Sequence, residues 1–151
     1  MPDSALPTLF GALIAVALWV YALTAGADFG GGVWDFFARG PRKVAQRQLI
    51  AHAIGPIWEA NHVWLILVVV LLFVAFPLAF AAIMTALHVP LVAMLVGITL
   101  RGAAFVFRAY GPATPQWDRW GAVFAASSAV TPVLLGVVLG AVASGALRLD
   151  A

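Results

Sequence analysis

Long apolar stretches separated by short polar segments dominate the pattern of this chain. Each stretch reaches the length of about 20 residues that an α-helix needs to cross the hydrocarbon core of a bilayer. Only a corner at Phe76 and Pro77 separates the middle two stretches. We therefore predict an all-α integral membrane protein, a single transmembrane domain over residues 1–151 with four helical spans at about 8–26, 49–76, 78–107 and 120–147.

The first stretch has a competing interpretation as a cleaved signal peptide. Ala25, Gly26 and Ala27 supply the small residues of a cleavage site. The segment before the stretch, however, contains Asp3 and no lysine or arginine, whereas signal peptides begin with positive charge. The pattern therefore favours a membrane-spanning helix that is retained.

Composition narrows the classes of function. Hydrophobic residues make up 64% of the chain and charged residues 9%, whereas soluble domains are about 25% charged. These values exclude an ordinary soluble domain. The absence of cysteine excludes disulfides, thiolate metal sites and a cysteine nucleophile. The eight basic residues are too few and too scattered for a nucleic-acid surface, so we expect no nucleic-acid partner.

The basic residues indicate how the spans are oriented, because short cytoplasmic loops are enriched in lysine and arginine. The loops after the first and third spans, with the adjoining helix ends, contain seven of the eight basic residues, and Arg148 lies on the other side. We therefore predict that the seven lie toward the cytoplasm and that both termini face outward. The seven are Arg39, Arg42, Lys43, Arg47, Arg101, Arg108 and Arg119.

Three ionisable residues fall within the predicted spans or at their ends, where charge is costly and usually functional. Counted along the helices, Asp28, Glu59 and Arg101 lie at a similar depth, toward the cytoplasmic side. An ion pair between Arg101 and one carboxylate would leave the other carboxylate free to exchange protons. The alternative is a neutral network of hydrogen bonds that holds the helices together.

Glu59 carries the sharper chemical hypothesis. His52, Glu59 and His62 are spaced i, i+7 and i+10, which places two imidazoles and a carboxylate on one face of a continuous helix. Pro56 lacks the amide hydrogen for the carbonyl of His52, so a kink there would open a polar notch for water. The pattern predicts a proton path, with Trp58 beside it. The alternative to a proton path is that His52 lies at the headgroup boundary and that His62 forms a hydrogen bond with a neighbouring helix.

His88, with Met84 and Met94 nearby along the chain, is a candidate ligand for haem iron. A lone membrane histidine close to a proline more often bonds a helix carbonyl or a partner chain. We therefore predict that this chain alone binds no haem and no other metal.

Three motifs share one resemblance. Residues 26–35 read Gly-Ala-Asp-Phe-Gly-Gly-Gly-Val-Trp-Asp, residues 54–64 contain Gly-Pro-Ile-Trp-Glu-Ala-Asn-His, and residues 100–108 begin Leu-Arg-Gly. In content, order and separation they resemble the motifs of subunit II of cytochrome bd quinol oxidases, including the cyanide-insensitive oxidases.

The resemblance implies a subunit of a respiratory complex in the bacterial inner membrane that oxidises quinol, reduces oxygen to water and generates proton motive force. Haems b and d would belong to subunit I, the main partner. A small accessory membrane subunit, lipid and quinone are further partners that it implies. Glu59 matches the family's acidic position implicated in proton uptake from the cytoplasm, and Asp28, Trp58 and Arg101 match positions needed for an intact enzyme.

The resemblance covers the first of two four-helix halves found in the family. We therefore expect a truncated or split subunit that needs a second chain for the remaining helices. Two interpretations outside the family stay open. One is a small proton-coupled transporter in which Glu59 and Arg101 bind an ion or substrate, and the other is a structural assembly factor without transport.

Overall fold

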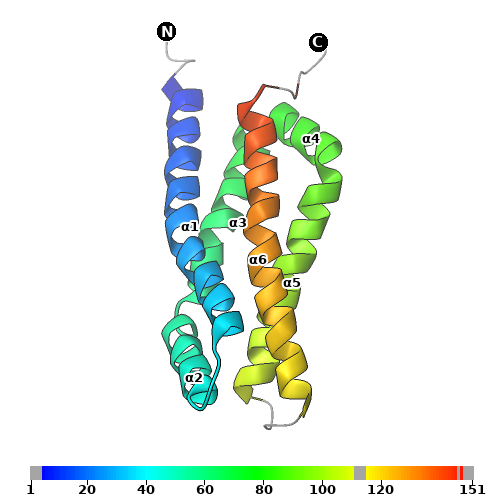
Figure 1. The fold of residues 1–151 in the computed structure, drawn as a ribbon. Coiled ribbons are helices and arrows are strands. Elements are labelled where there is room, and N and C mark those ends of the chain that lie inside the picture. The colour runs from blue at the N-terminus through cyan, green and yellow to red at the C-terminus, as the bar shows by residue number, and fades with distance from the viewer. Residues whose placement is uncertain (1–4, 111–114, 146, 148–151) are drawn as a thin grey trace.

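The computed structural model describes residues 5–110, 115–145 and 147. In these residues the chain forms six helices and no strand. Figure 1 shows long helices running side by side, with the start of α1, the end of α6 and all of α4 at one end of the bundle and α2 at the other. The helices are α1 (Ala5–Phe37), α2 (Lys43–Ile54), α3 (Trp58–Ala75), α4 (Pro77–Ala86), α5 (His88–Tyr110) and α6 (Pro115–Ala143).

Four of the described helices are long and apolar enough to cross a membrane, namely α1, α3, α5 and α6. Helix α1 packs against α3 on one side and α6 on the other, and α6 packs extensively against α5. The short helix α4 connects α3 to α5. The predicted all-α membrane protein is therefore confirmed.

The sequence pattern predicted that the second apolar stretch forms one continuous helix, but the structure divides it into two. Helix α2 ends at Ile54, a turn occupies residues 55–57, and α3 begins at Trp58. Pro56 lies in this turn, where its missing amide hydrogen and its ring prevent an α-helix from continuing. The expected kink is therefore a complete break, which makes α2 a separate helix at the end of the bundle (Figure 1).

The third stretch is also divided into two helices, where one span at about 78–107 was predicted. Leu87 lies between α4 and α5 with non-helical backbone angles, φ −111° and ψ 22°. Pro90, in the first turn of α5, has no amide hydrogen to donate to the carbonyl of Ala86. The chain therefore changes direction between these helices, and α4 lies across the end of the bundle (Figure 1).

Helix α1 extends well past the predicted end at Gly26. Gly30, Gly31 and Gly32, which follow the predicted span, are helical. A Cβ atom on Gly32 would collide with the side chain of Ser128 on α6. Glycine at this position therefore lets α1 and α6 approach closely, as small residues do between membrane helices. Helix α6 begins and ends earlier than its predicted span of 120–147.

The polarity of the bundle is the reverse of that in a soluble protein. Large apolar side chains cover its outside, including Trp19, which is 67% exposed. Charged side chains lie inside, and Asp28, Asp35 and Arg101 are each 1% exposed. This arrangement is favourable only where lipid surrounds the apolar surface and internal partners satisfy the charges.

Candidate functional site

Arg101 on α5 links three helices at the centre of the bundle. Its Nη2 donates a hydrogen bond to the main-chain oxygen of Asp28 on α1 at 2.9 Å, and its Nε donates to Ser128 Oγ on α6 at 3.2 Å. The guanidinium carbon lies 5.1 Å from the ring centre of Phe29 and 5.2 Å from that of Phe124. Hydrogen bonds and aromatic faces together stabilise this buried charge.

The carboxylate of Asp28 is bound by a residue that the sequence analysis did not single out. Asn61 Nδ2, on α3, donates to Asp28 Oδ2 at 2.7 Å, and both side chains are buried. Asp28 and Arg101 therefore lie together, although the hydrogen bonds of Arg101 go to a main-chain oxygen and a hydroxyl. Glu59, expected at the same depth, is exposed. We name Asp28, Asn61, Arg101 and Ser128 the buried polar core.

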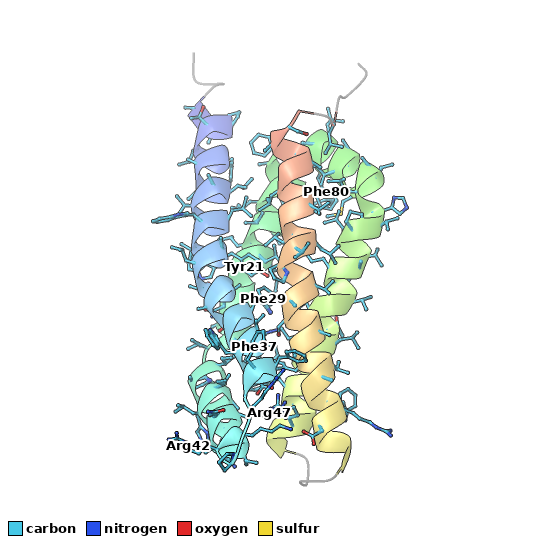
Figure 2. All side chains as sticks on the ribbon, viewed as in Figure 1. Tyr21, Phe29, Phe37, Arg42, Arg47 and Phe80 are labelled. Carbon is cyan, nitrogen blue, oxygen red and sulfur yellow. The ribbon has the colours of Figure 1, made fainter. Side chains whose placement is uncertain are left out.

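His62 lies beside the buried polar core, inside a cage of aromatic rings. Its ring centre is 5.8 Å from that of Tyr21, 6.1 Å from that of Phe29 and 6.2 Å from that of Trp58. Figure 2 shows Tyr21 and Phe29 directed from α1 toward the interior. Both imidazole nitrogens are buried, and neither has a hydrogen-bond partner in the described part of the chain. A hydrogen bond from His62 to a neighbouring helix, the alternative weighed above, is not seen among these described residues.

Glu59 lies in the first turn of α3, and its side chain is exposed on the outside of the bundle. His52 belongs to α2 and is also exposed, with Nδ1 3.0 Å from the main-chain oxygen of Gln48. The prediction that His52, Glu59 and His62 share one continuous helix face is wrong, because the turn at 55–57 separates the first from the other two. Glu59 and His62 remain neighbours on α3 at spacing i, i+3.

Trp58 lies where α3 approaches α5. Its ring centre is 5.8 Å from that of Phe105. A Cβ atom on Gly102 would lie only 3.1 Å from the Trp58 ring, so glycine leaves room for the indole. Trp58 therefore contacts the helix turn that begins with Arg101 and closes one side of the cage around His62.

A second charge cluster, near α2, was missed in the sequence. Both terminal nitrogens of Arg108 donate to the carboxylate of Asp35 at 2.9 Å, and Arg47 Nε lies 3.5 Å from Asp35 Oδ2. Asp118 Oδ1 accepts hydrogen bonds from Arg47 at 3.0 Å and from Lys43 at 3.1 Å. Figure 2 shows Arg47 reaching from α2 toward the other helices. The cluster joins α1, α2, α5 and α6.

The spacing of Asp28 and Asp35 could have revealed this cluster. Seven residues are two helical turns, so the two carboxylates share one face of α1. We name this region the basic end; its six basic residues are Arg39, Arg42, Lys43, Arg47, Arg108 and Arg119. Arg148, predicted on the opposite side, lies outside the described residues.

The residues weighed as haem ligands occupy different environments. His88 is exposed at the start of α5, with Nδ1 2.9 Å from the main-chain oxygen of Thr85, whereas Met94 is buried. The helix-carbonyl contact offered as the alternative for His88 is thus observed. The described residues contain no group of three or more histidine, aspartate or glutamate side chains that could hold a metal ion.

Comparison with known proteins identifies the family. Residues 6–148 match the family described as cytochrome bd terminal oxidase subunit II. The chain is 33% identical over 135 residues to cytochrome bd ubiquinol oxidase subunit 2 of Bacillus subtilis, a match that covers 89% of this chain and 39% of the relative. It is 30% identical over 133 residues to cytochrome bd-I ubiquinol oxidase subunit 2 of Escherichia coli K12, covering 88% of this chain and 35% of the relative.

The chain thus spans little more than a third of the length of these relatives. The range matched by the family, residues 6–148, contains the positions of the buried polar core and of Trp58, Glu59 and His62. The chain therefore belongs to the cytochrome bd terminal oxidase subunit II family.

Proposed function

We propose that this chain acts as subunit II of a quinol oxidase in the bacterial inner membrane, with the basic end in the cytoplasm. The complex oxidises quinol and reduces oxygen to water. Subunit I holds haems b and d, and this chain supports that subunit and conducts protons. Family membership supports the assignment, as do the four apolar helices and the basic end, which has the composition of a cytoplasmic surface.

Glu59 is the group that takes up the proton. The observation that carries this proposal is a carboxylate exposed in the first turn of a membrane-spanning helix, next to a buried polar core. Such a group is costly in lipid unless water or a protein partner surrounds it. A carboxyl group that gains and loses a proton easily is suited to collecting protons from the cytoplasmic side.

His62 continues the path inward from Glu59. It lies one turn further along α3, and its ring reaches Tyr21 and Phe29 on α1. An imidazole can accept a proton on one nitrogen and release it from the other. In this proposal His62 relays protons from the exposed carboxylate of Glu59 toward the buried carboxylate of Asp28. His52, exposed on the separate helix α2, gathers protons near the surface.

Asp28, Arg101 and Trp58 have a structural role, because they hold the helices around the proton path in position. Arg101 joins α5 to α1 and α6, Asp28 joins α1 to α3 through Asn61, and Trp58 joins α3 to α5. Removing any of them would loosen several helices together. We expect such variants to lose both assembly and activity, whereas Glu59 variants lose activity alone.

The apolar outside of the bundle is the surface on which the partners assemble. Its exposed side chains require lipid, subunit I or further helices as neighbours. A small accessory subunit and quinone fit the same surface. Helices in addition to these, from the same polypeptide or from another one, would complete the subunit.

Glu59→Gln tests the proton path, because it keeps the shape and polarity of the side chain but cannot titrate. We expect oxygen consumption with quinol to fall by about 10²-fold, in the range typical for loss of a proton-transferring group. Haem absorption of the same purified complexes should stay unchanged. Glu59→Asp should retain much of the rate, because the carboxyl group remains.

His52→Gln is the matched control, since it also removes an exposed titratable group near the same end, and it should slow turnover less than Glu59→Gln. Asn61→Leu, which strips the donor from the Asp28 carboxylate, should instead lower assembly and activity together. If Glu59→Gln turns over like the parent, the proton enters elsewhere. If it loses its haems, Glu59 has a structural role and the chain is closer to an assembly factor.

A further inference from the structure

The corner between α1 and α2 combines exposed aromatic rings with arginines that are not neutralised. The side chains of Arg39 and Arg42 are exposed, and neither has a hydrogen-bond or ion-pair partner in the described ranges 5–110, 115–145 and 147. Figure 2 shows Arg42 pointing away from the bundle. By contrast, Lys43, Arg47 and Arg108 at the same end are paired with carboxylates.

The charge balance of the basic end is strongly positive. Its six basic side chains face two carboxylates, Asp35 and Asp118, and both carboxylates are already bound by Lys43, Arg47 and Arg108. Among the residues that the structure describes, Arg39 and Arg42 therefore have no counter-charge. Gly40, with φ 77°, allows the sharp turn that carries these arginines between the two helices.

An apolar surface lies directly beside these arginines. Trp34, Phe36 and Phe37, in the last turn of α1, are 71%, 55% and 56% exposed. They contact one another edge to face, with ring centres 6.5 Å apart for Trp34 and Phe37 and 5.6 Å apart for Phe36 and Phe37. Exposed aromatic rings at the end of a membrane helix are typical of the boundary between headgroups and acyl chains.

We propose that the α1–α2 corner binds an anionic phospholipid, whose phosphate pairs with Arg39 and Arg42 and whose acyl chain lies against Trp34 and Phe37. Arginine suits this site, because its guanidinium binds phosphate oxygens through two parallel hydrogen bonds. Neither a free anion nor a neutral lipid would satisfy both parts. An anion leaves the aromatic rings in water, and a neutral lipid leaves the charge uncompensated. This site is independent of the proton path.

The test uses the complete complex as isolated from membranes, held in mild detergent and titrated with phosphatidylglycerol or phosphatidylcholine of identical acyl chains. Bound lipid is counted by native mass spectrometry. We expect the parent protein to bind phosphatidylglycerol more tightly, and R39Q/R42Q to lose about tenfold in this affinity, since each basic residue near an anionic surface contributes appreciably. Affinity for phosphatidylcholine should change little.

Three matched variants locate the site. R39K/R42K keeps the charge and should retain most of the preference, whereas Arg119→Gln removes an exposed arginine from the start of α6 and should leave binding intact. Trp34→Ala should weaken the binding of phosphatidylglycerol and of phosphatidylcholine to a similar extent. Equal binding of the two lipids by the parent, or an unchanged preference in R39Q/R42Q, would overturn the proposal. So would complete displacement of phosphatidylglycerol by an equal concentration of inorganic phosphate, because the site would then recognise a free anion.

Discussion

Arg108 forms a bidentate ion pair with Asp35, in which Nη1 donates to Oδ2 and Nη2 donates to Oδ1, each at 2.9 Å. The two residues lie 73 positions apart, on α5 and α1, and both side chains are almost completely buried. This geometry is the strongest form of ion pair available to side chains. The pair therefore holds α1 and α5 together at the basic end, although α2, α3 and α4 separate these two helices along the chain.

Asp35→Asn should destabilise the bundle more than any surface substitution. Breaking one partner out of a buried ion pair costs about 3–5 kcal/mol, because an uncompensated charge stays inside. We expect a clear fall in the thermal midpoint in detergent, followed by far-ultraviolet circular dichroism. Asp118→Asn is the comparison, since the side chain of Asp118 is 65% exposed and its loss leaves Arg47 still beside Asp35, so we expect a smaller fall. Equal midpoints for both variants would contradict the structural role of Asp35.

Gly32→Ala should push α1 and α6 apart. The added methyl group would meet the Ser128 side chain, which cannot move away freely because it accepts a hydrogen bond from Arg101. Overpacking of this kind costs about 1–3 kcal/mol. Gly26→Ala makes the same chemical change on the same helix, where nothing lies within 4 Å of the new methyl group. Thermal unfolding should separate the two variants, with Gly26→Ala close to the parent.

His88→Ala should leave the haem content of the assembled complex unchanged. The imidazole is exposed, and its described contact is with the main-chain oxygen of Thr85. We expect the same haem content per complex as in the parent, measured with the pyridine haemochrome spectrum. A stoichiometric loss of one haem would instead place an iron ligand in this chain.

A reporter inserted at Arg42 should register the cytoplasm, and one fused after Ala151 should register the outside. The reason is the concentration of basic residues at the end that contains α2. Alkaline phosphatase and green fluorescent protein, active on opposite sides of the membrane, provide the two measurements. The reverse pattern would place Glu59 on the outer side and remove the proposed route for protons.

The sequence predicted the features that depend on length and on the cost of charge. Four apolar stretches gave the spanning helices, and the expense of charge in lipid correctly singled out Asp28 and Arg101, which meet in the structure. Helix breaks were harder to predict. A proline can kink a helix or end it, depending on whether neighbouring helices can hydrogen-bond the main-chain groups that it frees. At Pro56 the helix is interrupted by a turn.

Asp35 was missed for a related reason. The predicted first span ended at residue 26, so Gly30–Gly32 and Asp35 were placed outside it, since consecutive glycines in water favour a loop. Between packed helices the same glycines permit close approach. The helix therefore continues, and Asp35 is carried into the interior to meet Arg108.

The inverted polarity of the bundle also determines how this protein can vary. Lipid tails barely distinguish valine, leucine and isoleucine, so those exposed positions of α1, α3, α5 and α6 that face lipid can exchange these residues with little consequence. No other residue can replace a buried aspartate or arginine in this way, because its hydrogen-bond partners are fixed in number and direction. The interior side chains therefore specify this bundle more strictly than the side chains that face lipid do.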